Sequence, residues 1–228
     1  MFFFDPMYFV FVAPAFFLAL WAQYRVRSAY ARAQQQAAPL SGAAAARHIL
    51  DQAGLADVAI EMIPGSLSDH YDPREKVLRL SQDVYQNRSL AAVGIAAHES
   101  GHALQDAKHY APLAVRNLAV PAAGFGSGLG VLMLMFGAIL AIKPLFIIGL
   151  VAFGAVVFFQ LVNLPVELDA SNRAKRELVA LGIVPQAQMP YVNDVLNAAA
   201  WTYVAATLQA ILILLYYALM FAGRSRRD

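Results

Sequence analysis

Four long apolar runs constrain this chain more than any other feature of its sequence. A helix that crosses the hydrocarbon core of a bilayer needs roughly 20 apolar residues. The 228 residues are 60% hydrophobic and only 14% charged, which is far more apolar than an ordinary soluble domain. We therefore predict a mainly α membrane protein with about four transmembrane helices and a small α+β region. The apolar runs cover residues 7–24, 128–142 with their flanks, 145–164 and 198–223.

Charge around the runs predicts an orientation. Arg25, Arg27 and Arg32 follow the first run, and basic residues favour the cytoplasmic side of membrane helices. We expect this run to be an uncleaved anchor of a multi-pass protein of the inner or plasma membrane. Lys143 and Pro144 separate the second and third runs, which we expect to form a hairpin that returns the chain to the face it left. With the N-terminus outside, as this orientation implies, four spans would also put the arginines that follow the last run outside, which opposes the same tendency.

Composition excludes several kinds of site. A net charge of +2 is too small to indicate nucleic-acid binding, so we expect no nucleic-acid partner. The chain has no cysteine, which excludes disulfides and cysteine-ligated zinc. The glycine-rich segment 124–130 lacks the spacing and the lysine of a phosphate-binding loop, so we expect it to pack helices closely.

The polar segment over residues 33–110 predicts local structure outside the apolar runs. Ser41 and Ser89 each precede a helical pattern, and serine is a favoured N-cap residue. Alternation of apolar and polar residues favours short strands, and clustered Pro, Gly, Ser and Asp favour a loop. The predicted elements are a helix over 41–54, a strand over 57–63, a loop over 64–73, a strand over 76–81 and a helix from 89 to about 108.

A pattern that can bind metal stands in the second of these helices. The stretch AAHESGHALQ contains His98, Glu99 and His102 in an H-E-x-x-H arrangement. Positions i and i+4 share one face of a helix, so both imidazoles can bind a single ion. In zinc sites of this kind, one position is kept for water, and the adjacent glutamate acts as the general base. The alternative is that these are interfacial polar residues without a metal. Polar side chains in an apolar stretch cost free energy unless they have partners, and one bound Zn²⁺ would be such a partner.

A two-histidine site needs a third ligand, and several residues could supply it. Asp106 and His109 follow on the same helix, but one helix rarely curls three successive turns of ligands round an ion. Glu167 and Asp169 follow the expected hairpin and so return to the same membrane face. Glu167 is the better placed, because two histidines on one helix and a glutamate on a second form the gluzincin arrangement. Its alternative role is that of an interfacial residue near the helix start after Pro165.

Four separate blocks of the sequence resemble a known family. LSDHYDPREKVLRLSQDVY, AAHESGHALQDAKHYAPLAVRN, LVNLPVELDASNRA and VLNAAAWTYVAA resemble, in this order, the YugP-like bacterial membrane proteins, described as neutral zinc metallopeptidases. The resemblance implies an integral membrane zinc metallopeptidase with His98 and His102 as ligands, Glu99 as the catalytic residue and Glu167 as the third ligand. The layout is also similar to the membrane gluzincins of the HtpX and CAAX-prenyl type. Those have an aspartate four residues after the glutamate, where this chain has Ser171.

Supporting residues are expected from this comparison and from the residue types. Asp169 could orient a ligand histidine in place of the missing aspartate. Arg173 could face the site or form an ion pair with Glu177 one turn later. The stretch from Asp69 through the following strand fits an edge strand that pairs with an extended substrate. Asp69, His70 and Tyr71 could then reach the cleft, where His70 or Tyr71 could stabilise the oxyanion; the alternative is a turn that only precedes a strand.

Two other functions stay open on the sequence. The first is a site-2-type intramembrane protease that uses Asp169, because the stretch NLPVELDA imitates the N-x-x-P-x-x-x-L-D-G segment of that class, with a shorter spacing. The apolar stretch around the histidine motif is, however, short for a membrane span. The second is a non-catalytic membrane scaffold that keeps zinc for structure, although structural zinc usually has four protein ligands.

Together these features predict five regions of the chain. We expect the active site at the cytoplasmic face, with membrane lipids and a membrane-associated protein or peptide substrate as partners; oligomeric state is open. The regions are an N-terminal transmembrane anchor over 1–24, a catalytic region with the H-E-x-x-H helix over 25–124, a transmembrane hairpin over 125–164, a second part of the catalytic region with the third ligand over 165–197, and a C-terminal transmembrane helix and basic tail over 198–228.

Overall fold

A computed structural model describes residues 6–66 and 68–224 of the chain as helices, strands and their connections. Two arginines of the expected basic tail, Arg226 and Arg227, lie outside these residues. The chain divides into two compact units, which are described separately below. The apolar unit comprises Met1–Trp21, Ala114–Pro165 and Trp201–Asp228, and the α+β unit comprises Ala22–Leu113 and Val166–Ala200.

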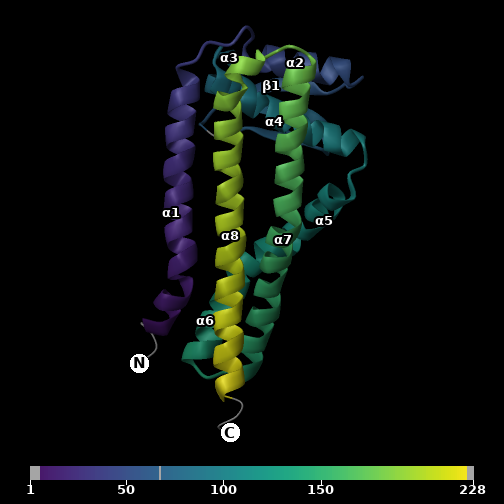
Figure 1. Ribbon diagram of the computed structural model, residues 1–228. Coiled ribbons are helices and arrows are strands. Elements are labelled where there is room, and N and C mark those ends of the chain that lie inside the picture. The colour runs from purple at the N-terminus through teal and green to yellow at the C-terminus, as the bar shows by residue number, and fades with distance from the viewer. Residues whose placement is uncertain (1–5, 67, 225–228) are drawn as a thin grey trace. The chain divides into compact units, whose positions relative to one another are not determined.

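Four helical stretches are long and apolar enough to cross a membrane, counted over the described part of the chain (Figure 1). The number and the mainly α class agree with the sequence prediction. The second stretch begins at Ala111, earlier than the apolar run by itself indicates, and includes a short π-helix. The helices are α1 (Pro6–Gln34), then α5 (Ala111–Phe125), the π-helix η1 (Gly126–Gly130) and α6 (Val131–Ile139) in succession, α7 (Lys143–Ala180), and α8 (Met189–Arg224), which follows the 3₁₀ turn η2 (Gln186–Gln188).

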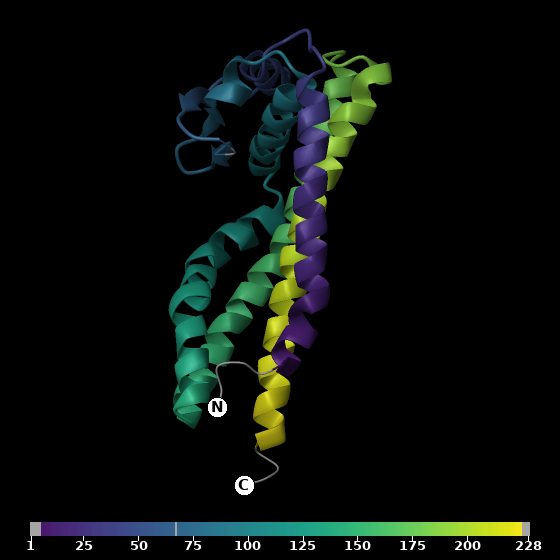
Figure 2. The same ribbon diagram turned by 90° about the vertical axis from the view of Figure 1, so that its left-hand side faces the viewer.

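Small residues hold the hairpin of the apolar unit together. Figure 2 shows the η1–α6 stretch and the first part of α7 as the two arms of this hairpin. A Cβ added at Gly126 would collide with the carbonyl of Ala152, and one at Gly137 would collide with the backbone of Phe146. Helices in a bilayer gain little from excluding water, so close backbone approach through glycine is a main source of their association. The expected packing role of the glycine-rich segment is confirmed for Gly126.

The α+β unit contains a three-stranded sheet. Its strands are β1 (Ala59–Ile63), β2 (His70–Asp72) and β3 (Val77–Ser81), in the order β1-β3-β2. β3 is central, with β1 parallel and β2 antiparallel to it. Both predicted strands are confirmed. The predicted loop over 64–73 is wrong in part, because its last residues form β2, which is too short to show an alternating pattern.

Three helices of this unit pack around the sheet and each other. α2 (Gly42–Gln52) and α4 (Leu90–Ala107) are the predicted helices, while α3 (Gln82–Gln86) was not foreseen. The predicted caps are confirmed: the side chain of Ser41 accepts a hydrogen bond from the backbone of Ala44, at 3.3 Å. Ser89 does the same for α4, at 3.2 Å. Fully buried side chains join these helices to the sheet; they include Leu50, Leu78, Leu80, Val84 and Ala96.

Removing one of these buried side chains should destabilise the fold. Leu80 is fully buried on the central strand, so Leu80→Ala leaves a cavity and should cost about 2–5 kcal/mol. Met62 lies on β1 and is 49% exposed, so Met62→Ala should change stability by less than about 0.5 kcal/mol. Thermal unfolding of the two purified variants in the same detergent measures both effects. Equal midpoints for the two variants would contradict this description of the core.

Candidate active site

α4 presents both histidines of the H-E-x-x-H motif from one face. The helix is continuous from Leu90 to Ala107, so His98 and His102 lie one turn apart. Their ring centroids are 4.9 Å apart, with the rings nearly perpendicular. Glu99 and His102 are buried, and His98 is partly buried. The local helix therefore supplies two imidazoles that converge on one point, as the spacing predicts.

Gly101 lets α7 approach this face of α4. A Cβ at Gly101 would lie 2.5 Å from the carbonyl oxygen of Ala170, closer than real side chains come to a neighbour. Only glycine therefore permits this separation of the two helices. Ala170 follows Glu167 by three residues on α7, which is nearly one helical turn. The contact thus places the Glu167 side chain beside the two histidines.

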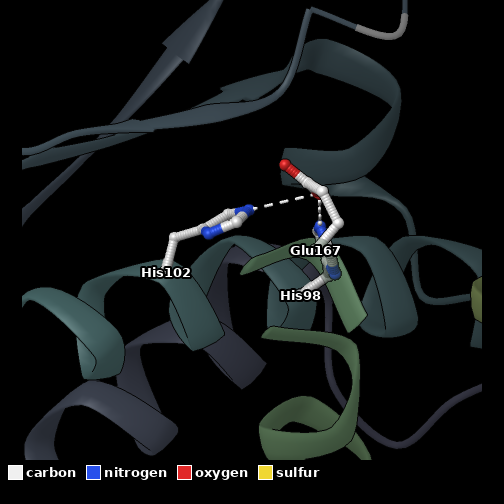
Figure 3. Close-up of side chains that lie close together, drawn as sticks. All are labelled: His98, His102 and Glu167. Atoms are coloured by element: carbon white, nitrogen blue, oxygen red, sulfur yellow. Dashed lines mark hydrogen bonds and ion pairs between the residues drawn. The ribbon is translucent and has the colours of Figure 1, made fainter. Parts of the chain in front are cut away.

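The carboxylate of Glu167 completes a cluster of three possible metal ligands (Figure 3). Its Oε2 lies 3.2 Å from Nε2 of His98 and 3.6 Å from Nε2 of His102. One ligand atom from each of the three residues lies within 4.8 Å of the others. All three residues belong to the α+β unit, from α4 and α7. His102 and Glu167 are buried, and His98 is partly buried.

Burial and charge make this cluster favourable for a cation. Burial raises the pKa of the Glu99 carboxyl, while the neighbouring histidines act in the opposite direction. Burial by itself lowers the pKa of His102, but the hydrogen bond to Glu167 and the charges of Glu99 and Glu167 outweigh it and raise that pKa. The Glu167 carboxylate thus stabilises positive charge on the neighbouring imidazole of His102. Among the described residues, the Glu99 carboxylate accepts no hydrogen bond, and its nearest charged neighbours are the two histidines and Glu167.

The donor set fits zinc. Two imidazole nitrogens and one carboxylate oxygen form the His₂Glu set of catalytic zinc sites, which keep a further position open. Glu99 lies next in sequence to His98, which is the position of the general base in H-E-x-x-H zinc sites. Calcium and magnesium prefer sets made of oxygen ligands alone, so they fit these residues less well.

Comparison with known proteins agrees with this geometry. The family described as "Putative neutral zinc metallopeptidase" matches residues 8–222. The chain belongs to this family. It is 43% identical over 218 residues to "Putative membrane protease YugP" of Bacillus subtilis (strain 168), a match that covers 94% of this chain and 97% of that protein. No solved structure matches the chain. The chain is thus a member of a zinc metallopeptidase family. Its four long apolar helices and its similarity to a membrane protein make it a membrane protein.

The residues expected near the substrate cleft have different surroundings. Asp69 accepts hydrogen bonds from the backbone and hydroxyl of Ser81, at 2.8 and 3.0 Å, so it ties the start of β2 to the end of β3. His70 is exposed, and its Nδ1 lies 2.8 Å from the carbonyl oxygen of Ser68. The Tyr71 hydroxyl donates to Asp106 at 2.9 Å. Burial, and then this hydrogen bond, raise the pKa of Tyr71 above its ordinary value.

The other proposed third ligands lie outside the cluster. Asp106 instead accepts the hydrogen bond of Tyr71, which ties β2 to the end of α4. Asp169 forms an ion pair with Arg173, whose Nε lies 2.5 Å from Asp169 Oδ2. Arg173 thus pairs with the residue one turn before it, where we expected Glu177 one turn after it. Asp169 is bound to neighbours other than the ligand atoms.

Two residues that contact the two histidines of the cluster were not foreseen in that role. The Ser171 hydroxyl lies 3.1 Å from Nδ1 of His98. The Gln105 amide oxygen lies 3.0 Å from Nδ1 of His102. The available signal for Gln105 was its position: it follows His102 by three residues, and so lies on the same face of the helix.

Enlarging Gly101 should damage the site without removing a ligand. Gly101→Ala forces α7 away from α4 at Ala170, so Glu167 moves from the histidines, and we expect zinc affinity to fall at least about tenfold. Gly94→Ala is a matched control seven residues earlier on α4, because its Cβ would meet only the Val192 side chain, at 3.2 Å. Competition with a chelator measures both affinities. Equal zinc affinity in the two variants would contradict the role of this helix contact.

Two acidic residues of α7 should differ in their effect on zinc. Glu167→Gln removes a ligand, so the variant should lose most of its bound metal. Asp169→Asn leaves all three ligands in place and should keep one zinc per chain when zinc is in excess. Elemental analysis of the purified proteins measures this content. Loss of zinc from the Asp169 variant alone would indicate the site-2 type of site instead.

Proposed function

We propose that this membrane protein hydrolyses peptide bonds as a zinc metalloendopeptidase of the gluzincin type. His98, His102 and Glu167 hold one zinc ion, and Glu99 is the catalytic residue. The observation that supports this most is the convergence of the three ligand atoms within 4.8 Å, with Glu99 next in sequence to His98 on the same helix. Family membership supports the same class of chemistry.

Each residue of the site then has a chemical task. A bound zinc ion supplies a Lewis acid that polarises the scissile carbonyl and makes hydroxide available near neutral pH. Glu99 takes the proton from the attacking water as its oxygen bonds to the carbonyl carbon. Glu99 then gives this proton to the amide nitrogen, so that the carbon–nitrogen bond breaks and a neutral amine leaves. The burial that favours a protonated Glu99 suits this second step.

The sheet offers a way to align the substrate. β2 is an edge strand, because it pairs with β3 on one side only. An extended peptide can add to such an edge through backbone hydrogen bonds. The hydrogen bond from Tyr71 to Asp106 fixes β2 to α4, one turn after His102, so a peptide bound along β2 would be held near the ligands. The Tyr71 hydroxyl donates its proton to Asp106, and His70, the neighbouring residue on β2, points to the opposite face of the sheet, so we propose no oxyanion role for either side chain.

The sequence around Glu167 supports a site near the membrane surface. Glu167 follows the apolar run over 145–164 by three residues, on the same helix. Arg25, Arg27 and Arg32 follow the first apolar run and favour the cytoplasmic side for the α+β unit. We therefore propose cleavage of membrane-associated proteins or peptides at the cytoplasmic face of the cell membrane.

Neither alternative function fits the cluster as well. A site-2-type protease would use Asp169 as a ligand, yet Asp169 is bound to Arg173 and Gln105. A purely structural zinc site is usually closed by four protein ligands, and this cluster has three. The open position and the adjacent Glu99 favour catalysis over a scaffold.

Replacing the proposed catalytic carboxylate should separate binding from turnover. Glu99→Gln keeps the size and burial of the side chain but cannot accept the proton, so we expect zinc to stay bound and peptide hydrolysis to fall at least about a hundredfold. Purified wild type and variant are compared on a quenched fluorescent peptide library in detergent. Unchanged hydrolysis by a zinc-loaded variant would refute the role of Glu99.

A further inference from the structure

A buried amide links one ligand histidine to α7. Gln105 is fully buried on α4, three residues after His102. Its Nε2 donates to the carbonyl oxygen of Val166 at 2.8 Å and to Oδ2 of Asp169 at 2.9 Å. Its Oε1 lies 3.0 Å from Nδ1 of His102. The amide therefore uses both of its ends: Nε2 donates to two groups of α7, and Oε1 faces His102.

These contacts permit only one orientation of the amide. The Val166 carbonyl and the Asp169 carboxylate can only accept hydrogen bonds, so the NH₂ group of Gln105 must face them. Its oxygen then faces His102 and can only accept. The Nδ1 atom of His102 must therefore carry the proton, and the lone pair of a neutral ring lies on Nε2. That nitrogen is the one that lies 3.6 Å from Oε2 of Glu167.

An ion pair stabilises the far end of this chain of contacts. Asp169 accepts from Nε of Arg173 at 2.5 Å, so its carboxylate stays an acceptor for Gln105. The guanidinium of Arg173 also lies over the Tyr110 ring, 5.7 Å from its centroid. Asp169 thus reaches the ligand histidine through an amide, in place of the direct carboxylate–histidine contact common in metal sites.

We propose that Gln105 is a positioning residue that fixes His102 in the form that offers Nε2 to the metal. This inference rests on the proposed zinc site and adds how one of its ligands is oriented. It does not extend to His98, because the Ser171 hydroxyl beside that ring can either donate or accept. His102 is therefore the ligand whose bonding nitrogen is imposed by the protein before metal binds.

The proposal predicts a spectroscopic change as well as a loss of affinity. In Gln105→Met, a side chain of similar length no longer accepts from Nδ1, and Glu167 becomes the best acceptor for the ring proton. ¹⁵N spectra of histidine-labelled protein without metal, at alkaline pH, should show His102 protonated on Nδ1 in the wild type and on Nε2 in the variant. Zinc affinity of the variant should fall roughly 10–100-fold, as for other groups that orient metal ligands.

Ser100→Ala is the matched control for stability. Ser100 is fully buried on the same helix and donates only to the Ala96 carbonyl, at 2.8 Å, so its loss removes a buried hydrogen bond away from the ligands. We expect this variant to keep the wild-type zinc affinity and the Nδ1 proton of His102. An equal loss of affinity in both variants would reduce Gln105 to a structural residue and overturn the proposal.

A second variant keeps the proposal testable if Gln105→Met does not fold. Asp169→Ala changes a side chain that is 25% exposed and removes one of the two acceptors that orient the amide. Zinc affinity should then fall roughly threefold to tenfold, less than for direct loss of the amide. Unchanged affinity in this variant would overturn the proposal. So would a wild-type spectrum in which Nδ1 of His102 is unprotonated.

Failure of the proposed function would look different. The ring proton is measured in protein without metal, so it reports on Gln105 even if the wild type hydrolyses no peptide. A wild type that binds zinc with a protonated Nδ1 but hydrolyses nothing would contradict the peptidase and leave the positioning role supported.

Discussion

The close contact between α4 and α7 at Gly101 decides what the rest of this site can do. Each helix alone has incomplete chemistry, since α4 has two imidazoles and α7 has the carboxylate of Glu167. The missing side chain at Gly101 lets the carbonyl of Ala170 approach, and this brings the three ligand atoms within 4.8 Å of one another. The same approach allows Gln105 to reach the Val166 carbonyl at 2.8 Å. Ligand convergence and ligand orientation therefore have one steric cause.

Electrostatics makes the assembled cluster dependent on a cation. Glu99 and Glu167 are both buried, and burying carboxylates without compensation is costly. If Gln105 holds a proton on Nδ1 of His102, then Nε2 and the Glu167 oxygen face each other as two acceptors. A proton or a metal ion between the two acceptors removes their repulsion. The arrangement that orients the ligands thus also favours a bound metal over an empty site.

Much of this fold follows from local sequence signals, and the rest depends on long-range contacts. The histidine pair could be predicted because i, i+4 spacing acts within one helix, and the serine caps could be predicted for the same reason. Glu167 needed the additional inference that a hairpin returns the chain to one face. β2 was missed because three residues show no periodicity. The role of Gln105 could not be read from the sequence, since it depends on the side-chain geometry of α7 against α4. Arg173 has an acidic residue four positions away on either side, Asp169 and Glu177, and spacing alone does not choose between them.

X-ray absorption at the zinc edge of the loaded wild-type protein tests the central claim most directly. The His98, His102 and Glu167 cluster predicts one zinc per chain, with two imidazole nitrogens at about 2.0–2.1 Å and the remaining ligands oxygen. Replacing either histidine by alanine should remove one imidazole signal or the metal itself. A zinc ion with no imidazole in its shell, or a wild type that binds no zinc, would contradict this account.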